Sequence, residues 1–418
     1  MTRLTAAVAA LAWTTVLAGC GLGGDGEDTS LTLVAADYGD SAENSTTKYW
    51  DEVVDAFEKD NPGIEVKVTV LPWTEVDARV KKMVDEGETP DMAQIGSYSD
   101  YAADDRLYTA NELLSIAVQA DFLPTLVSAG RVSRVHYGLP FASSTRLLFY
   151  NKRLFEEAGV TEPPRTWEEL KDAAVLLKQH GVDFPYALPL GPEEAQGEAL
   201  MWMLSGGHPR GYTDNVGNYD FDSAANVRTF TWLKDELVGA GLTGPTPPAE
   251  LNRADAFAAF TEGDVGMLNG HPTLMRMSDK KDVDYGMVPM PGRTGRSEAA
   301  LGVADWMMAF KENGHREQIG TFLDFVYAEK NVLDFSRRYD LLPVTNSAVE
   351  AMAGNKADAD LLEFLDGLRG AQLYPVSKTS WPQVSADIKE RIGRAVVEDG
   401  DPDAVLKLLQ RSAVRVDG

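Results

Sequence analysis

The chain has 418 residues, which exceeds what one ordinary hydrophobic core accommodates and therefore predicts two lobes or domains. Apolar residues make up 44% and charged residues 25%, as in soluble globular proteins. There are 65 Asp and Glu residues against 39 Lys and Arg, and the resulting net charge of −26 argues against binding to nucleic acid or to an anionic membrane surface.

The first twenty residues read as a targeting segment. Arg3 supplies a positive charge, and an apolar stretch over 4–16, too short to span a membrane, follows it. The next residues, LAGC, resemble the lipobox of bacterial lipoproteins. This resemblance implies cleavage before Cys20, a lipid on its thiol and an anchor on the outer face of the cell membrane. Cys20 is the single cysteine, so no disulfide can form within the chain.

Residues 21–30, GLGGDGEDTS, are expected to form a flexible tether. They contain G-x-G-x-x-G, but without a preceding strand or a following helix this does not predict a dinucleotide site. Strands are then predicted at 31–36, 64–70 and 92–95, and helices with one apolar face at about 47–59 and 75–85. This alternation predicts right-handed crossovers and a parallel sheet.

The stretch 137–180 has the clearest local signals. The apolar run over 147–150 predicts a strand, and a short helix over 153–158 ends at Gly159. Thr166 and Glu169 form a capping box for a helix that reaches residue 180. Farther on, the patterns predict helices at 198–205, 227–238 and 319–335, a hairpin near 217–226, a strand at 301–310, and a mainly helical C-terminal part.

The stretch "YGLPF…LLFYNKRLFEEAGVTEPPRTWEELKDAA" resembles the signature of family 1 extracellular solute-binding proteins, the maltose-binding type of receptor for ABC sugar importers. WDEVVDAFEKDNPGIEV, EGETPDMAQI, GDVGM and YGMVPMP resemble other segments of that family, in the expected order. The resemblance implies an α/β fold of two lobes, each a mainly parallel sheet flanked by helices. One lobe would hold 31–141 and 302–343 and the other 142–301 and 344–418, with hinge crossings near residues 141, 302 and 343.

The same resemblance implies that the protein is a monomer that captures a mono- or oligosaccharide between its lobes and delivers it to an ABC permease, without a cofactor. Sugar recognition requires aromatic faces and planar polar groups, and open α/β sheets bind ligands beyond the carboxyl ends of their strands. On these grounds and by resemblance, the candidate ligand contacts are Tyr38, Asp40, Trp73, Ser97, Tyr98, Asp305, Trp306 and Arg338 in the first lobe and Gln196, Asn269, His271 and Trp381 in the second. His271 stands where relatives often have a tryptophan.

The tryptophans divide by context. Four lie on apolar helix faces and are expected in the core: Trp50, Trp167, Trp202 and Trp232. Trp73 and Trp381 stand beside prolines in turn-like contexts, which favours binding, and Trp381 is expected to precede the first turn of a helix and to project outward. For Trp306 and His271, a ligand contact and an ordinary structural role remain equally open.

Two alternative functions remain open. An anchored extracellular glycosidase would need two carboxylates facing one another at about 5–9.5 Å. A receptor for a non-sugar solute, such as a polyamine or a phosphodiester, would be favoured by a cleft dominated by charge. The five histidines are scattered without an H-E-x-x-H motif, and there is no G-x-S-x-G motif, so neither a metal site nor nucleophilic catalysis is expected.

Overall fold

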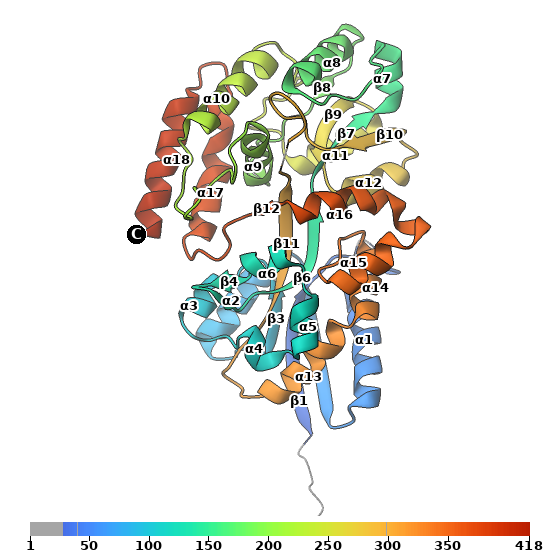
Figure 1. The fold of residues 1–418 in the computed structure, drawn as a ribbon, viewed down its shortest axis with the longest axis vertical. Coiled ribbons are helices and arrows are strands. Elements are labelled where there is room, and N and C mark those ends of the chain that lie inside the picture. Colours follow the sequence, from blue (N-terminus) through green and yellow to red (C-terminus); the bar gives the residue numbers. More distant parts are fainter. Residues whose placement is uncertain (1–27, 40, 298) are drawn as a thin grey trace, which may run out of the picture.

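The computed structural model describes residues 28–39, 41–297 and 299–418, so Cys20 and Asp40 lie outside the described residues. Two lobes are stacked end to end and joined by extended strands (Figure 1). This confirms the predicted two-lobe α/β fold. Within the described ranges, no helix has the length and apolar character needed to cross a bilayer.

The sheet of lobe 1 has six strands, with the order β12-β11-β3-β1-β2 and with β6 on the other edge of β11. Its strands are β1 (Thr29–Ala36), β2 (Ile64–Leu71), β3 (Met92–Ile95), β6 (Leu139–Thr145), β11 (Leu301–Ala309) and β12 (Gln372–Leu373). As predicted, β1 pairs in parallel with β2 and β3, whereas β11 runs antiparallel to β3 and β6. Pro140 lies inside β6, where the register with β11 shifts between Asp305 and Trp306, so the proline occupies an irregularity rather than a regular ladder position.

Helices flank this sheet. The first group is α1 (Thr46–Asp60), α2 (Val76–Glu86), α3 (Ser99–Ala103), α4 (Ala110–Leu113), α5 (Ile116–Asp121) and α6 (Pro124–Ala129), followed by the hairpin of β4 (Arg131–Val132) and β5 (Val135–His136). The helix expected over 319–335 is two helices, α13 (Arg316–Val326) and α14 (Glu329–Tyr339), because Ala328 takes an extended conformation at the start of the second. Trp50 is buried against Phe141, with ring centroids 5.6 Å apart.

The sheet of lobe 2 has four strands in the order β10-β7-β9-β8, namely β10 (Tyr285–Val288), β7 (Leu147–Asn151), β9 (Val265–Gly270) and β8 (Phe184–Tyr186). The expectation of a mainly parallel sheet is wrong for this lobe, because β7 runs antiparallel to both β9 and β10 and only β8 and β9 pair in parallel. Its helices are α7 (Lys152–Ala158), α8 (Trp167–Gln179), α9 (Ala195–Ser205), α10 (Ala224–Trp232) with the π-helical turn η1 (Leu233–Val238), α11 (Arg253–Glu262), α12 (Pro272–Asp279), α17 (Trp381–Arg391) with the 3-10 turn η3 (Ile392–Ala395), and α18 (Pro402–Asp417). Gly159 ends α7 with a φ of 75°, and the predicted capping box begins α8. Trp167, Trp202 and Trp232 pack together with centroids 4.7–5.9 Å apart, which confirms their place in the core.

The chain passes between the two sheets at three places. The first passage is at Arg146, between β6 and β7, five residues later than expected. The second is at the start of β11. The third lies later than residue 343, because α15 (Asn346–Ala353) still packs on lobe 1, where the Asn346 side-chain amide donates to the carbonyl of Asp121 at 2.8 Å. The 3-10 turn η2 (Lys356–Leu361) and α16 (Leu362–Arg369) follow, beside β6.

Candidate functional site

Three side chains of lobe 1 follow the carboxyl ends of neighbouring parallel strands. Tyr38 follows β1, Trp73 follows β2 and Ser97 follows β3, and all three are partly exposed. Together with Asp77, Gln94 and Asp305 they form what we call the lobe 1 rim. Because parallel strands end at one edge of a sheet, this rim lies where α/β sheets bind ligands.

Tyr38 is the centre of the lobe 1 rim. Its hydroxyl donates to Oδ2 of Asp305 at 2.8 Å and accepts from Nε2 of Gln94 at 2.7 Å. The Trp73 ring meets the Tyr38 ring edge to face, with centroids 5.4 Å apart. Gln94 is itself held because its Oε1 accepts the backbone N–H of Ala36 at 2.9 Å. Tyr38 and Asp305 are therefore fixed in place while part of each remains exposed.

Asp305 occupies an unpaired stretch of strand edge. β12 pairs with β11 at Leu301 and Gly302, and β3 pairs with the same edge from Trp306 onward, so residues 303–305 lie between the two partner strands. All three are partly exposed. Burial and the nearby charge of Asp77 raise the pKa of Asp305 to about 6. A carboxyl group at an open strand edge is thus available to a ligand.

The opposite rim, on lobe 2, is made of charged pairs. It comprises Arg146, Glu193, Glu194, Gln196, Arg253 and His271, and we call it the lobe 2 rim. Arg146 donates to Glu194, which also contacts Nε of Arg253. Arg253 donates from Nη2 to Glu193 Oε1 at 2.5 Å, and its Nη1 lies 3.1 Å from Nε2 of His271. Burial and the arginine charges hold the pKa of His271 well below its usual value, so this ring is neutral near pH 7.

Glu198 lies beneath the lobe 2 rim, where it is 7% exposed. Its Oε1 accepts three hydrogen bonds, from Trp202 Nε1 at 2.8 Å, Asn269 Nδ2 at 2.9 Å and the Tyr186 hydroxyl at 3.1 Å. Burial nevertheless raises its pKa to about 7. The adjoining cavity, of about 20 Å³, is lined by Arg146, Glu194, Glu198, Arg253 and Asn269 among others and has room for about one water molecule.

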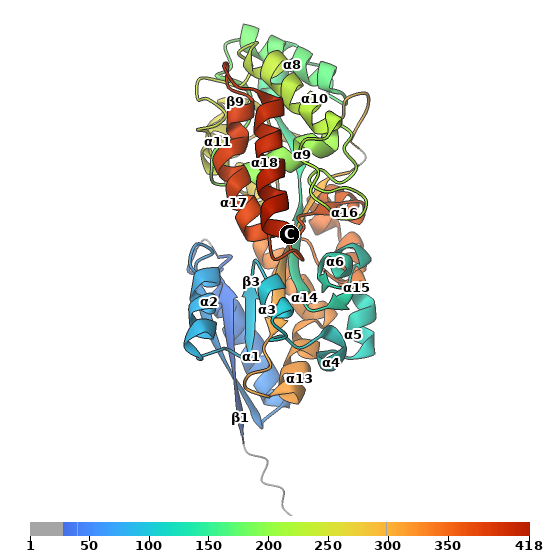
Figure 2. The same cartoon turned by 90° about the vertical axis from the view of Figure 1, so that its left-hand side faces the viewer.

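Strand β11 sets the spacing of the two rims. Gly302 pairs with Leu373, and the next residue, Tyr374, stacks on Trp381 in lobe 2 with centroids 5.3 Å apart. Asp305 lies three residues beyond Gly302, which is roughly 10 Å along an extended strand. Figure 2 shows the side of the molecule on which α2 of lobe 1 lies below α11 and α17 of lobe 2.

The structure brings six of the predicted site residues to the rims: Tyr38, Trp73, Ser97, Asp305, Gln196 and His271. Tyr98 and Trp306 are fully buried instead. The Tyr98 hydroxyl donates to the carbonyl of Ala129 at 2.5 Å, and its ring lies 5.3 Å from that of Trp306. In this conformation they form core beneath the rim, because β11 turns the side chain after Asp305 inward. Asn269 is 5% exposed and lies beneath the lobe 2 rim.

Two further residues differ from their expected placement. Arg338 pairs with Glu52 at 2.6 Å, and its guanidinium lies over the Tyr49 ring, so its charge is engaged by α1 rather than by the rim. Trp381 is 7% exposed and is the first residue of α17, with Ser380 as the N-cap. Its ring packs between Tyr374 and Tyr212, so it is enclosed rather than projecting outward.

Sequence reasoning missed several rim residues, namely Asp77, Gln94, Arg146, Glu193, Glu194 and Arg253. Arg146 is the single charged residue in the stretch ASSTRLLFY, which was a usable signal. Glu193, Glu194 and Arg253 stand at the starts of α9 and α11, on the loops that lead out of strands or turns. Their mutual pairing joins residues that are far apart in the chain, so no local pattern shows it.

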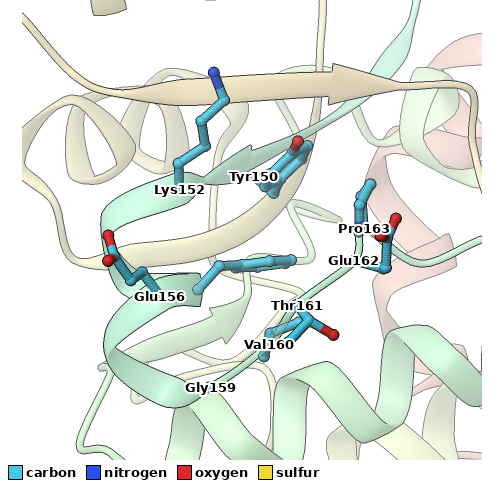
Figure 3. A pocket seen from close by; sticks show the side chains of 9 residues that line it. Tyr150, Lys152, Glu156, Gly159, Val160, Thr161, Glu162 and Pro163 are labelled. Carbon is cyan, nitrogen blue, oxygen red and sulfur yellow. The ribbon is translucent and has the colours of Figure 1, made fainter.

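A separate hollow of about 420 Å³ lies on lobe 2 alone, between β7, α7 and the loop after α7. Figure 3 shows Tyr150, Lys152, Glu156 and Glu162 around it. Because all its lining residues belong to one lobe, relative motion of the lobes would not open or close it. Over 28–39, 41–297 and 299–418, no three His, Cys, Asp or Glu side chains gather in a way that could hold a metal ion.

Comparison with known proteins places this geometry in a family. A family model described as bacterial extracellular solute-binding protein matches residues 43–332. A binding protein of Brucella abortus (strain 2308) is 27% identical over 367 residues, which are 87% of this chain and 88% of that protein. UgpB of Escherichia coli (strain K12), an sn-glycerol-3-phosphate-binding periplasmic protein, is 26% identical over 246 residues, 56% of this chain and 55% of UgpB.

Among solved structures, the cyclic alpha-maltosyl-1,6-maltose binding protein from Arthrobacter globiformis matches with a TM-score of 0.77, covering 93% of this chain and 98% of that chain at 17% identity. This likeness shows a shared fold. These proteins are binding proteins rather than enzymes. Because the family model matches well over half of the sequence, the chain belongs to the family of bacterial extracellular solute-binding proteins.

Proposed function

We propose that this protein captures a carbohydrate, or a closely similar polyhydroxylated solute, between the two rims and delivers it to the permease of an ABC importer. The observation that carries the proposal is the Gln94–Tyr38–Asp305 hydrogen-bond chain beside Trp73, at the open edge of β11. The names of the relatives support it, since a cyclic maltosyl-maltose and sn-glycerol-3-phosphate both carry several hydroxyl groups.

The rims offer the groups that a sugar requires. The C–H face of a sugar ring packs against an aromatic ring, for which the partly exposed Trp73 is placed. Hydroxyl groups would donate to Asp305 and to Gln196, whose Oε1 has no donor among the described residues. Recognition would thus require both rims at once.

Closure of the lobes would complete the site. Three passages of the chain join the lobes, and the contacts that bridge them include Ser99 Oγ to the Lys378 carbonyl at 3.4 Å and Arg276 to Asp340 at 3.6 Å. Hinge motion about such passages is a common mode of closure around ligands. A solute that touches both rims would favour the closed form by the free energy of those contacts.

The proposal includes binding without catalysis. The two carboxyl groups with strongly raised pKa values, Asp305 and Glu198, belong to different lobes, and Glu198 is already engaged by three donors. This arrangement does not supply the facing pair of a glycosidase. A phosphodiester receptor is also less well supported, because both rim arginines already have glutamate partners.

The lipid anchor at Cys20 belongs to the same proposal. The described chain begins at β1, at the end of lobe 1 that is remote from lobe 2 (Figure 1). An anchor a few residues earlier would leave the rims free to meet a permease. We expect the Cys20→Ser variant to appear in the culture medium or to stay unprocessed, and normal membrane retention of this variant would refute the anchor.

A thermal-shift screen tests the function. A solute at a hundred times its Kd stabilises the folded state by about 2.7 kcal/mol, which raises the melting temperature by several degrees. We expect such a rise with at least one mono- or oligosaccharide, and a smaller rise for the Trp73→Ala variant with the same sugar. If no carbohydrate raises the melting temperature while a phosphodiester does, the proposed solute class is wrong.

A further inference from the structure

We infer that the solute of this protein carries a protonated amine, which Asp305 and Asp77 bind at the lobe 1 rim. The inference rests on the proposed function, because it assigns a chemical class to the solute of the same site. An amino sugar combines this group with the hydroxyls that the rest of the site suits. A linear polyamine carries the same ammonium group and is the alternative source.

The first argument is that both carboxylates of the lobe 1 rim lack a cation. Oδ2 of Asp305 accepts from Tyr38, and its Oδ1 accepts no hydrogen bond from any described residue. Oδ1 of Asp77 accepts the backbone N–H of Gly96 at 3.0 Å. Neither has a Lys, Arg or His partner within 4.0 Å in the described part of the chain. Asp77 is bonded to Gly96, the residue directly after β3, and Asp305 directly precedes Trp306, which pairs with Ile95 at the end of β3. Both carboxylates therefore lie at the same end of β3.

The second argument is that two buried acceptors on the lobe 2 side lack a donor among the described residues. Asn269 is 5% exposed and lines the small cavity beneath the rim, where its Oδ1 has no donor among the described residues. Oε1 of Gln196 is likewise buried without a donor in the described part of the chain. The rim arginines are already engaged by glutamates. An ammonium group supplies three donors and no acceptor, and a polyol supplies further donors, so an amino sugar complements this surplus of acceptors.

The third argument is the pairing of aromatic rings with carboxylates. The Tyr38 and Trp73 rings stand at the same rim as Asp305, and aromatic faces attract ammonium groups. Burial, with a smaller contribution from charge repulsion by Asp77, raises the pKa of Asp305 to about 6 in the absence of a cation. A bound ammonium group would relieve this repulsion. The site is therefore complementary to positive charge before any solute enters.

The experiment is isothermal titration at pH 7 with matched solutes. Glucosamine and short chitosan oligomers provide the amine, glucose and short cello-oligomers provide neutral counterparts of the same shape, and putrescine and spermidine provide amines without a sugar. A hydrogen bond to a charged group contributes about 1.5–3 kcal/mol, so we expect the amino sugars to bind roughly tenfold to a hundredfold more tightly than the neutral sugars.

Variants then locate the effect. Asp305→Asn and Asp77→Asn should each weaken amine binding about tenfold or more, and because burial raises the pKa of both carboxyl groups, neither change should destabilise the free protein. Asp172→Asn, on the exposed face of α8, is the matched control and should bind like the parent. If both rim variants bind the amine like the parent, the assignment to these carboxylates is wrong.

The outcomes separate the inference from the proposed function. Neutral sugars that bind as tightly as amino sugars would overturn the inference and leave carbohydrate capture standing. Polyamines that bind while no sugar does would support the ammonium site and overturn carbohydrate capture. If no sugar and no amine binds, both are overturned.

Discussion

The two rims, one on each lobe, are built on opposite principles. On lobe 1, Asp305 and Asp77 have no cationic partner within the described residues, and Tyr38 and Trp73 remain partly exposed. On lobe 2, every charge of the rim that the structure describes has a partner of opposite sign or a hydrogen bond, and Glu198 beneath it accepts three. The carboxylates of the lobe 1 rim therefore lack counter-charges and are ready for a ligand. The charged groups of the lobe 2 rim already have partners, which hold them rigidly.

This difference shows that a raised pKa alone does not identify a binding group. Asp305 and Glu198 both have raised values, and burial is the main cause for both. Asp305 accepts one hydrogen bond and remains partly exposed, while Glu198 is nearly enclosed. Substitutions on the two rims should therefore affect different quantities, affinity on lobe 1 and stability on lobe 2.

The largest expected effect is on stability, at Trp381. Because its ring is enclosed by Tyr374 and Tyr212, Trp381→Ala should lower the free energy of unfolding by about 3–5 kcal/mol. Trp73→Ala, on the lobe 1 rim, should reduce solute affinity with a much smaller loss of stability. Denaturant unfolding and titration of both variants measure this contrast. A Trp381→Ala protein of parental stability but weakened affinity would show that Trp381 binds the solute and does not hold the core together.

The next effect depends on pH and concerns Glu198. Its pKa rises from the ordinary value of 4.5 to about 7 on folding, so between these values the folded state retains a proton that the unfolded state has lost. The stability contributed by the protonated group is complete below pH 4.5 and is lost as the pH rises through 7. Glu198→Gln should therefore match the parent at pH 4 and be more stable at pH 8 by up to about 3 kcal/mol. If the melting temperatures of the parent and of Glu198→Gln change with pH in the same way, this account is wrong.

A smaller loss of stability is expected at Glu194, which pairs with both Arg146 and Arg253. Glu194→Gln leaves Arg146, whose side chain is 9% exposed, without a counter-charge, so it should lower the free energy of unfolding by about 2–3 kcal/mol. The control is Glu157→Gln, which removes an exposed pair with Arg153 and should cost less than about 0.5 kcal/mol. Chemical denaturation measures both losses. If Glu194→Gln and Glu157→Gln lower the free energy of unfolding equally, the lobe 2 rim is no more rigid than the surface.

The smallest effect is expected for Tyr38→Phe. The ring stays, but the hydroxyl that connects Gln94 to Asp305 is lost, which should weaken solute binding by about 0.5–1.5 kcal/mol. Titration at pH 7 measures this change. The matched variant Tyr108→Phe, in lobe 1 beside the last residue of β11 and outside the rim, should leave affinity unchanged.

Much of the fold could be predicted because its signals are local. The alternation of strand and helix patterns over 31–95 fixes a parallel sheet, and this alone places Tyr38, Trp73 and Ser97 at one edge. The break between α13 and α14 could not be predicted, since neither glycine nor proline marks it. The register shift that accommodates Pro140 inside β6 depends on the partner strand β11, so no local pattern shows it.

The site could be predicted less well, because its contacts join distant segments. Asp305 meets Tyr38 only because β11 pairs with β3, and this pairing spans more than 200 residues of the chain. The local context of Trp381 correctly indicated the start of a helix, but it carried no information on the two tyrosines that enclose the ring. Burial depends on such neighbours, and local sequence patterns do not specify them.

The most direct test of solute capture between the lobes is amide hydrogen exchange, measured with and without the panel member that most raises the melting temperature. Exchange should slow on both rims together, near residues 37–39, 72–74, 96–98 and 303–306 on lobe 1 and 193–197 and 270–272 on lobe 2. Protection confined to one lobe, for example around Tyr150 and Glu162 in the hollow of Figure 3, would contradict binding between the rims.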